Sequence, residues 1–97
     1  MKRIGRDSFI RNCCIAAGNS DQSGLQSHLW PLASNDVSAI VRGHAVWALG
    51  ELSRPKHATG VLRPDIQVQL TALLASEQDD DVREEISLTI NDIKERL

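Results

Sequence analysis

Aromatic residues and long apolar runs are both scarce in this 97-residue chain. It holds two Trp, one Phe and no Tyr, while Ala, Leu, Ile and Val carry its apolar content. This composition suits closely packed helices better than sheets, in which aromatic side chains are enriched. No apolar run approaches the roughly 18 residues of a membrane span, and the amino terminus lacks the apolar segment of a secretory signal. We therefore expect one small cytoplasmic domain that does not enter a membrane.

Patterns that indicate catalysis or metal binding are also missing. Cys13 and Cys14 are adjacent, so they point about 100° apart around a helix and cannot easily hold one metal ion. His28, His44 and His57 lack the helical or carboxylate spacing of a zinc site, and the chain has no CxxC pair, Gly-rich phosphate loop or nucleophile elbow. We expect no metal, no cofactor and no enzymatic activity in these residues, and inert packing for both cysteines.

What the chain does contain is an internal repeat. The segment LWPLASNDVSAIVR, residues 29–42, returns forty-one residues later as LTALLASEQDDDVR, residues 70–83. A third, degenerate copy lies upstream, where residues 15–19 match residues 47–51. A period of about 40 to 47 residues with two helical patterns per unit is typical of stacked helix pairs of the HEAT kind.

The repeat predicts an all-α fold, a short right-handed α-solenoid of HEAT-like helix pairs with about five helices. We expect one domain, residues 1–97, with units at about residues 1–20 (partial), 22–53 and 64–97 and a basic loop at residues 54–63. The apolar positions that recur at helical spacing should be structural and buried: Leu29, Leu32, Val41, Ala45, Trp47, Leu49, Leu70, Leu73, Val82, Ile86 and Ile90. Thr89, standing opposite Ala48, is the one mismatch among the matched positions of the last helix.

Helix boundaries follow from turn residues and caps. The first helix should run from about Asp7 to Ala17, the second over residues 22–33, the third from residue 37 or 38 to 52, the fourth from Pro64 and the fifth after the aspartate cluster at residues 79–81. Pro31 should distort the second helix because it removes a hydrogen-bond donor. Asp36 or Ser38 should cap the third.

Charge is uneven along the chain, although the net charge is only −2. Residues 1–63 hold eight Lys or Arg against four Asp or Glu, and residues 64–97 hold three against nine. The two parts should therefore face different partners. An ordinary solvated surface remains the alternative interpretation of either excess.

The segment from Val41 to Gly50 contains the densest group of unusual residues. Arg83 should have a structural role, pairing with the acidic turn before it or with a neighbouring repeat's turn, whereas Arg42 is left open between structural pairing and contact with a ligand. Gly43 costs about 1 kcal/mol inside a helix relative to Ala, so we expect it to permit close approach of a ligand or another helix.

Two segments are distinctive enough to compare with a known family: GRDSFIRNCCIAAGNS, residues 5–20, and VRGHAVWALGEL, residues 41–52. The pairs Arg11-Asn12 and Gly18-Asn19 and the run Arg-Gly-His-x-x-Trp-Ala-Leu resemble the carboxy-terminal region of epoxyqueuosine reductase, the enzyme that completes queuosine in certain tRNAs. The resemblance covers about residues 3–53. That family has a cobalamin-binding reductase region, a ferredoxin-like segment with two [4Fe-4S] clusters, and a helical-repeat tail that helps to engage tRNA.

The resemblance implies that this chain corresponds to the tail alone. Cobalamin, the clusters and the catalytic acid of that oxidoreductase would lie outside it, so the implied partners are tRNA and upstream catalytic domains. The chain is then either a piece of such an enzyme or a separately encoded recognition module, and its oligomeric state stays open. The candidate tRNA-binding residues are Arg3, Arg6, Arg11, Asn12, Arg42, His44, Arg54, Lys56 and Arg63.

Two other functions compete with tRNA recognition. A generic protein-protein interaction domain of HEAT repeats would receive a helix or tail on its concave face and would use the acidic carboxy-terminal surface. A phycobilisome-lyase-like repeat protein has support only from the shared repeat pattern. The acidic part from Pro64 onward departs from a uniformly basic tRNA binder, which places any RNA contact on the first half of the chain.

Overall fold

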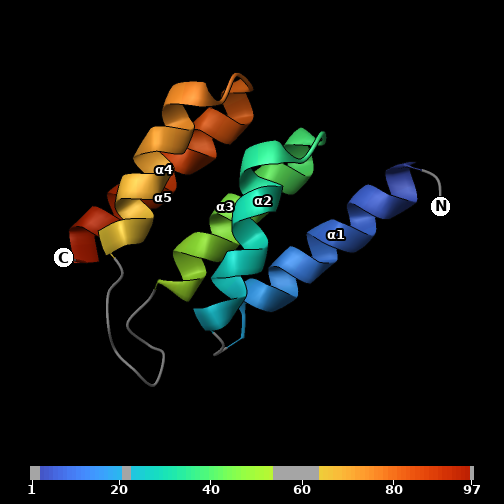
Figure 1. Ribbon diagram of the computed structural model, residues 1–97, viewed down its shortest axis with the longest axis horizontal. Coiled ribbons are helices and arrows are strands. Elements are labelled where there is room, and N and C mark those ends of the chain that lie inside the picture. The colour runs from blue at the N-terminus through green and yellow to red at the C-terminus, as the bar shows by residue number, and fades with distance from the viewer. Residues whose placement is uncertain (1–2, 21–22, 54–63, 97) are drawn as a thin grey trace.

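The computed structural model describes residues 3–20, 23–53 and 64–96, and the side chains of residues 5–20, 24–53 and 66–95. Along the chain follow α1 (Arg3–Gly18), a 3-10 turn η1 (Ser23–Leu25), α2 (Gln26–Asn35), α3 (Ala39–Leu52), α4 (Pro64–Ser76) and α5 (Asp80–Arg96). The described residues contain these five α-helices and no strand, which confirms the predicted all-α class (Figure 1).

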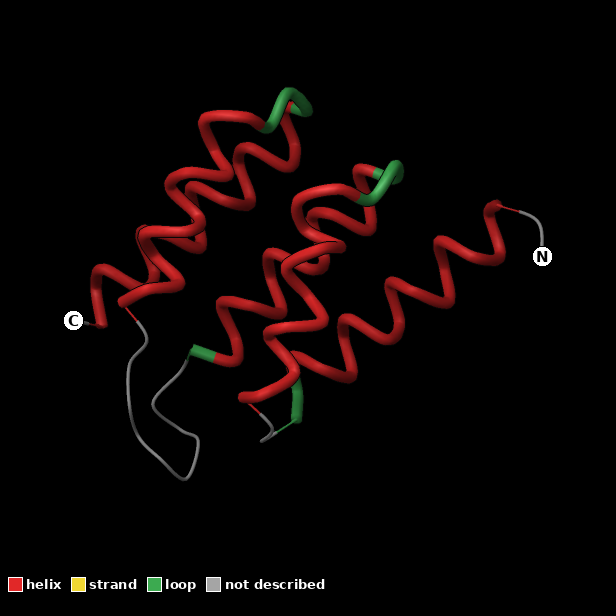
Figure 2. The backbone as a smooth tube through the Cα atoms, in the orientation of Figure 1, coloured by secondary structure: helices red, strands yellow, loops and turns green. Residues whose placement is uncertain are grey.

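The helices form two layers. α1, α3 and α5 lie side by side in one layer, and α2 and α4 lie in the other, as the ribbon and the backbone tube both show (Figures 1 and 2). α3 is central, because it packs against α1, α2 and α5, while α4 packs mainly on α5. The molecule measures 40 × 27 × 17 Å along its principal axes. This arrangement agrees with two helix pairs, α2 with α3 and α4 with α5, that lie next to each other.

The helix boundaries follow the predicted breaks with small shifts. α1 begins earlier than predicted, at Arg3, and the second predicted helix begins as the turn η1 before continuing as α2. α2 runs through Pro31 to Asn35, past the predicted end. Ser38 is the N-cap of α3, since its Oγ accepts a hydrogen bond from the backbone N–H of Val41. This result decides between the two predicted caps.

An apolar core lies between the layers, and every predicted structural residue is buried or packs on it. Val41, Ala45, Leu49, Leu70, Ile86, Val82, Leu29, Ile90 and Leu73 are buried, and Leu32 and Trp47 are partly buried against that cluster. On α1, Cys14 is buried, whereas Phe9 and Cys13 are exposed. The expected inert packing of both cysteines is therefore correct for Cys14 and wrong for Cys13.

Two glycines allow the helices of the first layer to approach closely. A Cβ atom on Gly18 would lie 2.6 Å from Cζ3 of Trp47 and 3.2 Å from Cα of Ala48. A Cβ atom on Gly50 would lie 2.7 Å from Cγ2 of Thr89. The contact between α1 and α3 is thus repeated between α3 and α5. Thr89, the one mismatch in the repeat, is buried and places its methyl group over Gly50.

Candidate functional site: repeated turns and an acidic groove

The turns α2–α3 and α4–α5 contain the same hydrogen bonds at matching positions of the repeat. Asp36 Oδ2 accepts a hydrogen bond from the backbone N–H of Ser38 at 3.0 Å, and Glu77 Oε2 accepts one from the N–H of Asp79, also at 3.0 Å. The side chains of Ser38 and Asp79 each accept a hydrogen bond from the backbone N–H three residues further on. Each turn therefore fixes a carboxylate at the matching position, Asp36 or Glu77, and caps the helix that follows.

Both carboxylates bind an arginine from the preceding helix of the first layer. Arg6 Nη2, on α1, donates to Asp36 Oδ1 at 2.6 Å. Arg42, on α3, donates from Nε and Nη2 to the two oxygens of Glu77, at 2.8 and 3.2 Å. These charge-assisted hydrogen bonds tie each helix pair to the unit before it. The sequence left the role of Arg42 open, and the structure shows that this side chain forms a structural ion pair.

The arginines lower the pKa of both carboxyl groups. For Asp36, the hydrogen bond from Arg6 is the largest cause, and burial opposes it. For Glu77, burial raises the pKa, but the hydrogen bonds from Arg42 and from two backbone N–H groups, with the charge of Arg42, lower it by more in total. Both carboxylates are therefore ionised at neutral pH, held between a cation and the backbone.

Arg83 binds the turn before it as predicted, but through backbone oxygens. Its Nη1 donates to the backbone oxygens of Leu74 and Glu77, at 2.7 and 2.9 Å. Carbonyl groups at the end of a helix have no partner within the helix, so a nearby guanidinium satisfies them. The role of Arg83 is structural as expected, but its partners are carbonyl oxygens at the end of α4 and not carboxylates.

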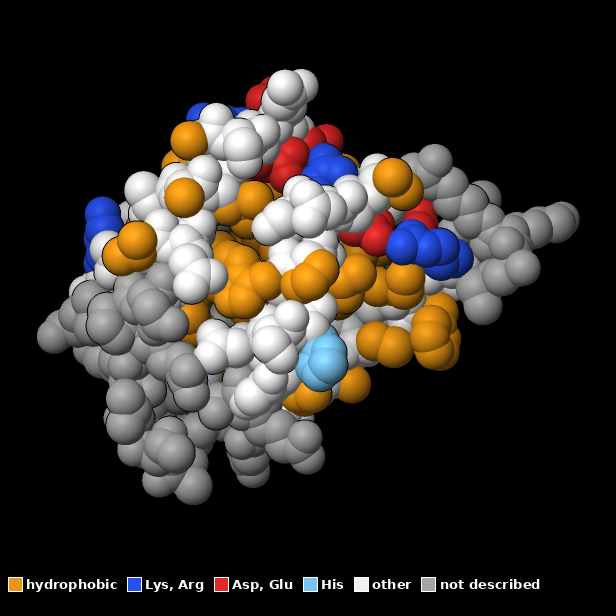
Figure 3. Space-filling model, in the orientation of Figure 1, with side chains coloured by type: hydrophobic (Ala, Val, Ile, Leu, Met, Phe, Trp, Pro, Cys, Tyr) orange, Lys and Arg blue, Asp and Glu red, His pale blue; other side chains and the backbone are white. Residues whose placement is uncertain are grey.

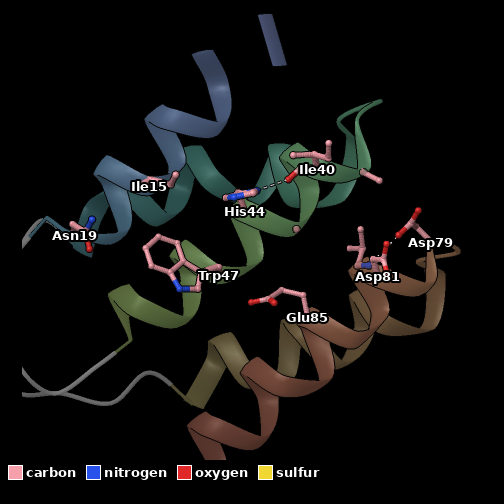
Figure 4. A pocket seen from close by; sticks show the side chains of 11 residues that line it. Ile15, Asn19, Ile40, His44, Trp47, Asp79, Asp81 and Glu85 are labelled. Atoms are coloured by element: carbon pink, nitrogen blue, oxygen red, sulfur yellow. Dashed lines mark hydrogen bonds between the residues drawn. The ribbon is translucent and has the colours of Figure 1, made fainter. Parts of the chain in front are cut away.

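A groove of about 610 Å³ opens on the layer of α1, α3 and α5. Figure 4 shows its side chains, which come from α1 and the residue after it (Ile15, Asn19), from α3 (Ile40, His44, Trp47) and from the α5 side (Asp79, Asp81, Glu85). Gly43 also lines it, and a Cβ atom there would meet nothing within 4 Å. The close approach expected at Gly43 is thus made by no described residue, and the position opens to the groove.

One wall of the groove is acidic. Asp79, Asp81 and Glu85 lie on the α5 side, facing an apolar surface that includes Trp47. Burial is the main reason that the pKa of Glu85 is raised, and the electrostatic interaction with His44 partly offsets it. His44 Nδ1 donates to the backbone oxygen of its own helix at 2.9 Å, so Nε2 is the ring atom left for a ligand. This arrangement suits a cation next to apolar surface.

The predicted tRNA-binding residues lie in different surroundings. Arg6 and Arg42 hold carboxylates, Arg11 and Asn12 lie further along α1, and His44 lies in the groove that carries the acidic wall. The side chains of Arg3, Arg54, Lys56 and Arg63 lie outside the described residues. Among the described residues, the structure brings Arg6 and Arg42 together at Asp36, whose carboxylate binds Arg6 and whose backbone oxygen accepts from Arg42 Nη1 at 2.8 Å, and it places His44 in the groove.

Two acidic residues of the site were not predicted from the sequence. Glu77 stands forty-one residues after Asp36, so the repeat contained the signal that the two carboxylates are equivalent. Glu85 stands forty-one residues after His44, and both line the groove. Equivalence in the repeat does not indicate that two side chains share a groove, because sharing depends on how neighbouring units stack.

The described residues show neither a metal site nor a membrane span. No group of three His, Cys, Asp or Glu side chains among them could hold a metal ion. None of the described helices is long and apolar enough to cross a bilayer.

Burial raises the pKa of the Cys14 thiol to about 11, which keeps it protonated and unreactive at neutral pH.

Comparisons with known proteins give one distant likeness. No family model matches the chain, and no solved structure matches it. The epoxyqueuosine reductase of Alicycliphilus denitrificans is 33% identical to it over 58 residues, which cover 53% of this chain and 16% of the reductase. The match therefore spans less than a fifth of that enzyme. It supports a distant, partial similarity to epoxyqueuosine reductase.

Proposed function

We propose that this chain is a non-catalytic binding module, a short right-handed α-solenoid of HEAT-like helix pairs that serves tRNA recognition in an epoxyqueuosine reductase or a protein derived from one. The single observation that carries the proposal is the similarity to that enzyme over 58 residues. The recurrence of the same carboxylate turn supports the solenoid, because regular stacking places similar contacts at successive steps; in each case an arginine of the neighbouring helix binds the carboxylate, although Arg6 and Arg42 do not stand at matching repeat positions.

The contacts within the chain limit which cations can bind phosphate. A guanidinium that already holds a buried carboxylate adds little net positive charge at the surface, so Arg6 and Arg42 are poor candidates. His44 lies in the groove with the acidic wall, which repels phosphate. The proposal therefore assigns tRNA contact to Arg11 and Asn12 and to the basic residues of the segment 54–63.

Filter binding of tRNA tests this assignment. We expect the combined changes Arg11→Glu, Arg54→Glu and Lys56→Glu to abolish retention of tRNA, because three phosphate contacts are lost. A single change should reduce the salt slope of binding by about one unit. Lys94→Glu, an equal charge change on α5, is the matched control and should bind normally. Equal losses from Lys94→Glu and from Arg11→Glu would contradict the proposal, and comparison of unmodified with queuosine-type tRNA would measure its selectivity.

The groove favours a second function, which is binding of a polypeptide segment. A Lys or Arg next to a large apolar side chain would place its charge near Asp81 and Glu85 and its apolar partner on Trp47. The partly desolvated carboxyl of Glu85 would gain a counter-charge. This function uses the opposite sign of charge from tRNA binding, so one set of variants separates the two.

Tryptophan fluorescence can measure the second function directly. In a Trp30→Phe variant, Trp47 is the one remaining indole. Titration with short peptides that alternate Arg and Leu should shift its emission. Peptides with Glu in place of Arg should not. The double change Asp81→Lys and Glu85→Lys should abolish the shift and leave retention of tRNA unchanged. If tRNA retention falls and the peptide signal persists, the groove is not a peptide site.

A further inference from the structure

α1 exposes apolar side chains on the side that points away from α3. Gly18 marks the side of α1 that contacts α3, because a Cβ atom there would meet the ring of Trp47. At 100° per residue, Phe9, Cys13 and Ala16 lie within about 40° of the opposite side of the helix. All three are exposed, Phe9 by 62%. We call these three residues the α1 stripe, and no other described residue covers it.

An apolar pocket of about 390 Å³ adjoins the α1 stripe. Its lining includes Cys13, Ala16 and Ala17 of α1 and Leu25, Leu29 and Leu32 of η1 and α2. It therefore opens between the first helix of one layer and the first helix of the other. Figure 3 shows hydrophobic side chains gathered over α1 beside α2 on this face of the molecule.

The equivalent surface of α3 is fully covered. An offset of thirty-two residues places Gly18 on Gly50, which are the two glycines that contact the next helix of the layer. The same offset places Phe9, Cys13, Ala16 and Ala17 on Val41, Ala45, Ala48 and Leu49. Each of these four α3 residues is 0% exposed, beneath α1 and α2. The apolar surface of α3 that α1 and α2 cover therefore has an equivalent on α1, and no described residue covers it there.

The outer face of α5, at the other end of the helix layer, is more polar than the α1 stripe, although Leu88 is exposed beside it. Gly50 faces Thr89 of α5, and Val46 of α3 and Ser53, the C-cap of that helix, lie about one turn on either side of it. Forty-one residues later, the equivalent positions of α5 are Ser87, Asn91 and Lys94. A polar outer face is typical of the last unit of a repeat stack. The two outer faces therefore differ, and that of α1 is the more apolar.

We propose that the α1 stripe and the adjoining pocket bind an amphipathic α-helix supplied from outside these 97 residues. The helix runs antiparallel to α1 and beside α2, as α2 runs against α3 after a turn of three residues. Its buried face carries the Leu-x-x-Leu pattern that α2 and α4 contribute to the core through Leu29 with Leu32 and Leu70 with Leu73. The bound helix would extend the existing layer of α2 and α4. Its binding requires neither tRNA nor the acidic groove.

Alkylation of Cys13 reports directly on this interface. Cys13 is exposed and lines the pocket, while Cys14 is buried and reacts slowly. The probe is a synthetic peptide with the sequence of residues 64–76, PDIQVQLTALLAS, which carries the required leucines. At saturating peptide, we expect the rate of Cys13 alkylation in the full chain to fall at least tenfold. A peptide with Asp in place of both leucines of the Leu-x-x-Leu pattern should have no effect.

Variants of exposed positions test where the helix binds. Phe9→Asp and Ala16→Glu should keep the circular dichroism and melting temperature of the parent chain, because neither side chain is buried, and both should abolish protection of Cys13. Leu88→Asp is the matched control, since Leu88 is 56% exposed on α5. It should leave the protection intact.

Three results would overturn the proposal. The first is an unchanged rate of Cys13 alkylation at millimolar peptide. The second is a dimer of the chain alone, measured by light scattering, in which Cys13 is protected until Phe9→Asp separates the copies, because the occupant is then a second copy. The third is unfolding of both variants, because the stripe would then support the fold of the chain itself.

Discussion

At the scale of single residues, glycine has opposite effects at two positions of α3. Gly43 opens to the groove, so a methyl group there meets no neighbour, while Gly50 lies against Thr89. Alanine loses less backbone entropy on folding than glycine. We expect Gly43→Ala to raise the free energy of unfolding by about 0.5 to 1 kcal/mol. We expect Gly50→Ala to lower it by about 1 to 3 kcal/mol through overpacking. Urea denaturation followed by circular dichroism measures both.

The contact at Gly50 can be checked by a compensating change. Thr89→Ser removes the Cγ2 methyl group that a Cβ atom at Gly50 would meet and keeps the hydroxyl. The double variant Gly50→Ala with Thr89→Ser should therefore recover most of the stability that Gly50→Ala loses. Strictly additive losses would show that the two side chains do not compete for the same space.

These positions show what sequence can and cannot say about a residue. A glycine inside a helical pattern signals that a side chain is disfavoured or unneeded, and this signal is equal at Gly43 and Gly50. Which of the two reasons applies depends on the neighbouring helix, and no neighbour can be read from a single chain. The exposed Phe9 is a similar case, because its helical spacing predicts burial only where another helix is present to cover it.

At the scale of elements, the ion pair between α3 and the α4–α5 turn should make stability depend on pH. The folded-state pKa of Glu77 lies below its ordinary value of 4.5, so its contribution is fully present above about pH 4.5 and is lost as pH falls through the lower, folded-state value. The raised pKa of Glu85 has the opposite sign and offsets part of this loss.

Replacement of Glu77 measures that contribution. Glu77→Gln leaves the guanidinium of Arg42 without a charged partner, so we expect unfolding to become easier by about 1 to 3 kcal/mol at pH 7. The difference between variant and parent should shrink as the pH is lowered below 4.5, because Glu77 then becomes protonated in the unfolded state first and, below its lowered pKa, in the folded state as well. Denaturation series at pH 7 and pH 3 give the two values. A difference that is the same at both pH values would exclude this explanation.

The repeat allowed the elements to be predicted better than the links between them. The period of forty-one residues located α2 to α5 and their buried leucines, because a helix buries one periodic face whatever its neighbour. The pairing of Arg42 with Glu77 joins successive units, so it depends on how far one unit is shifted against the next. That shift is set by close packing at Gly18 and Gly50, and it is visible only in three dimensions.

At the scale of the whole molecule, the position of each helix should govern how easily it opens. α3 has neighbours on three sides, α5 packs against α3 and α4, and α1 packs chiefly on α3. Local opening costs less where fewer contacts are lost, and in a stacked array the end elements open first. Hydrogen–deuterium exchange read by mass spectrometry at pH 7 should therefore show the slowest amides in α3 and faster exchange in α1.

Loosening one contact should change this pattern in one place. Gly18→Ala forces a methyl group against Trp47 and the backbone of Ala48, which weakens the packing of α1 on α3. Exchange in α1 should accelerate several-fold, while α4 and α5 keep their protection because the contacts of α5 with α3 and α4 are untouched. Gly43→Ala, the matched control within the same layer, should accelerate no helix. If Gly18→Ala instead accelerates exchange in α1 and α5 together, the helices open as one cooperative unit, and α1 is then too firmly joined to α3 to behave as the terminal helix of a stack.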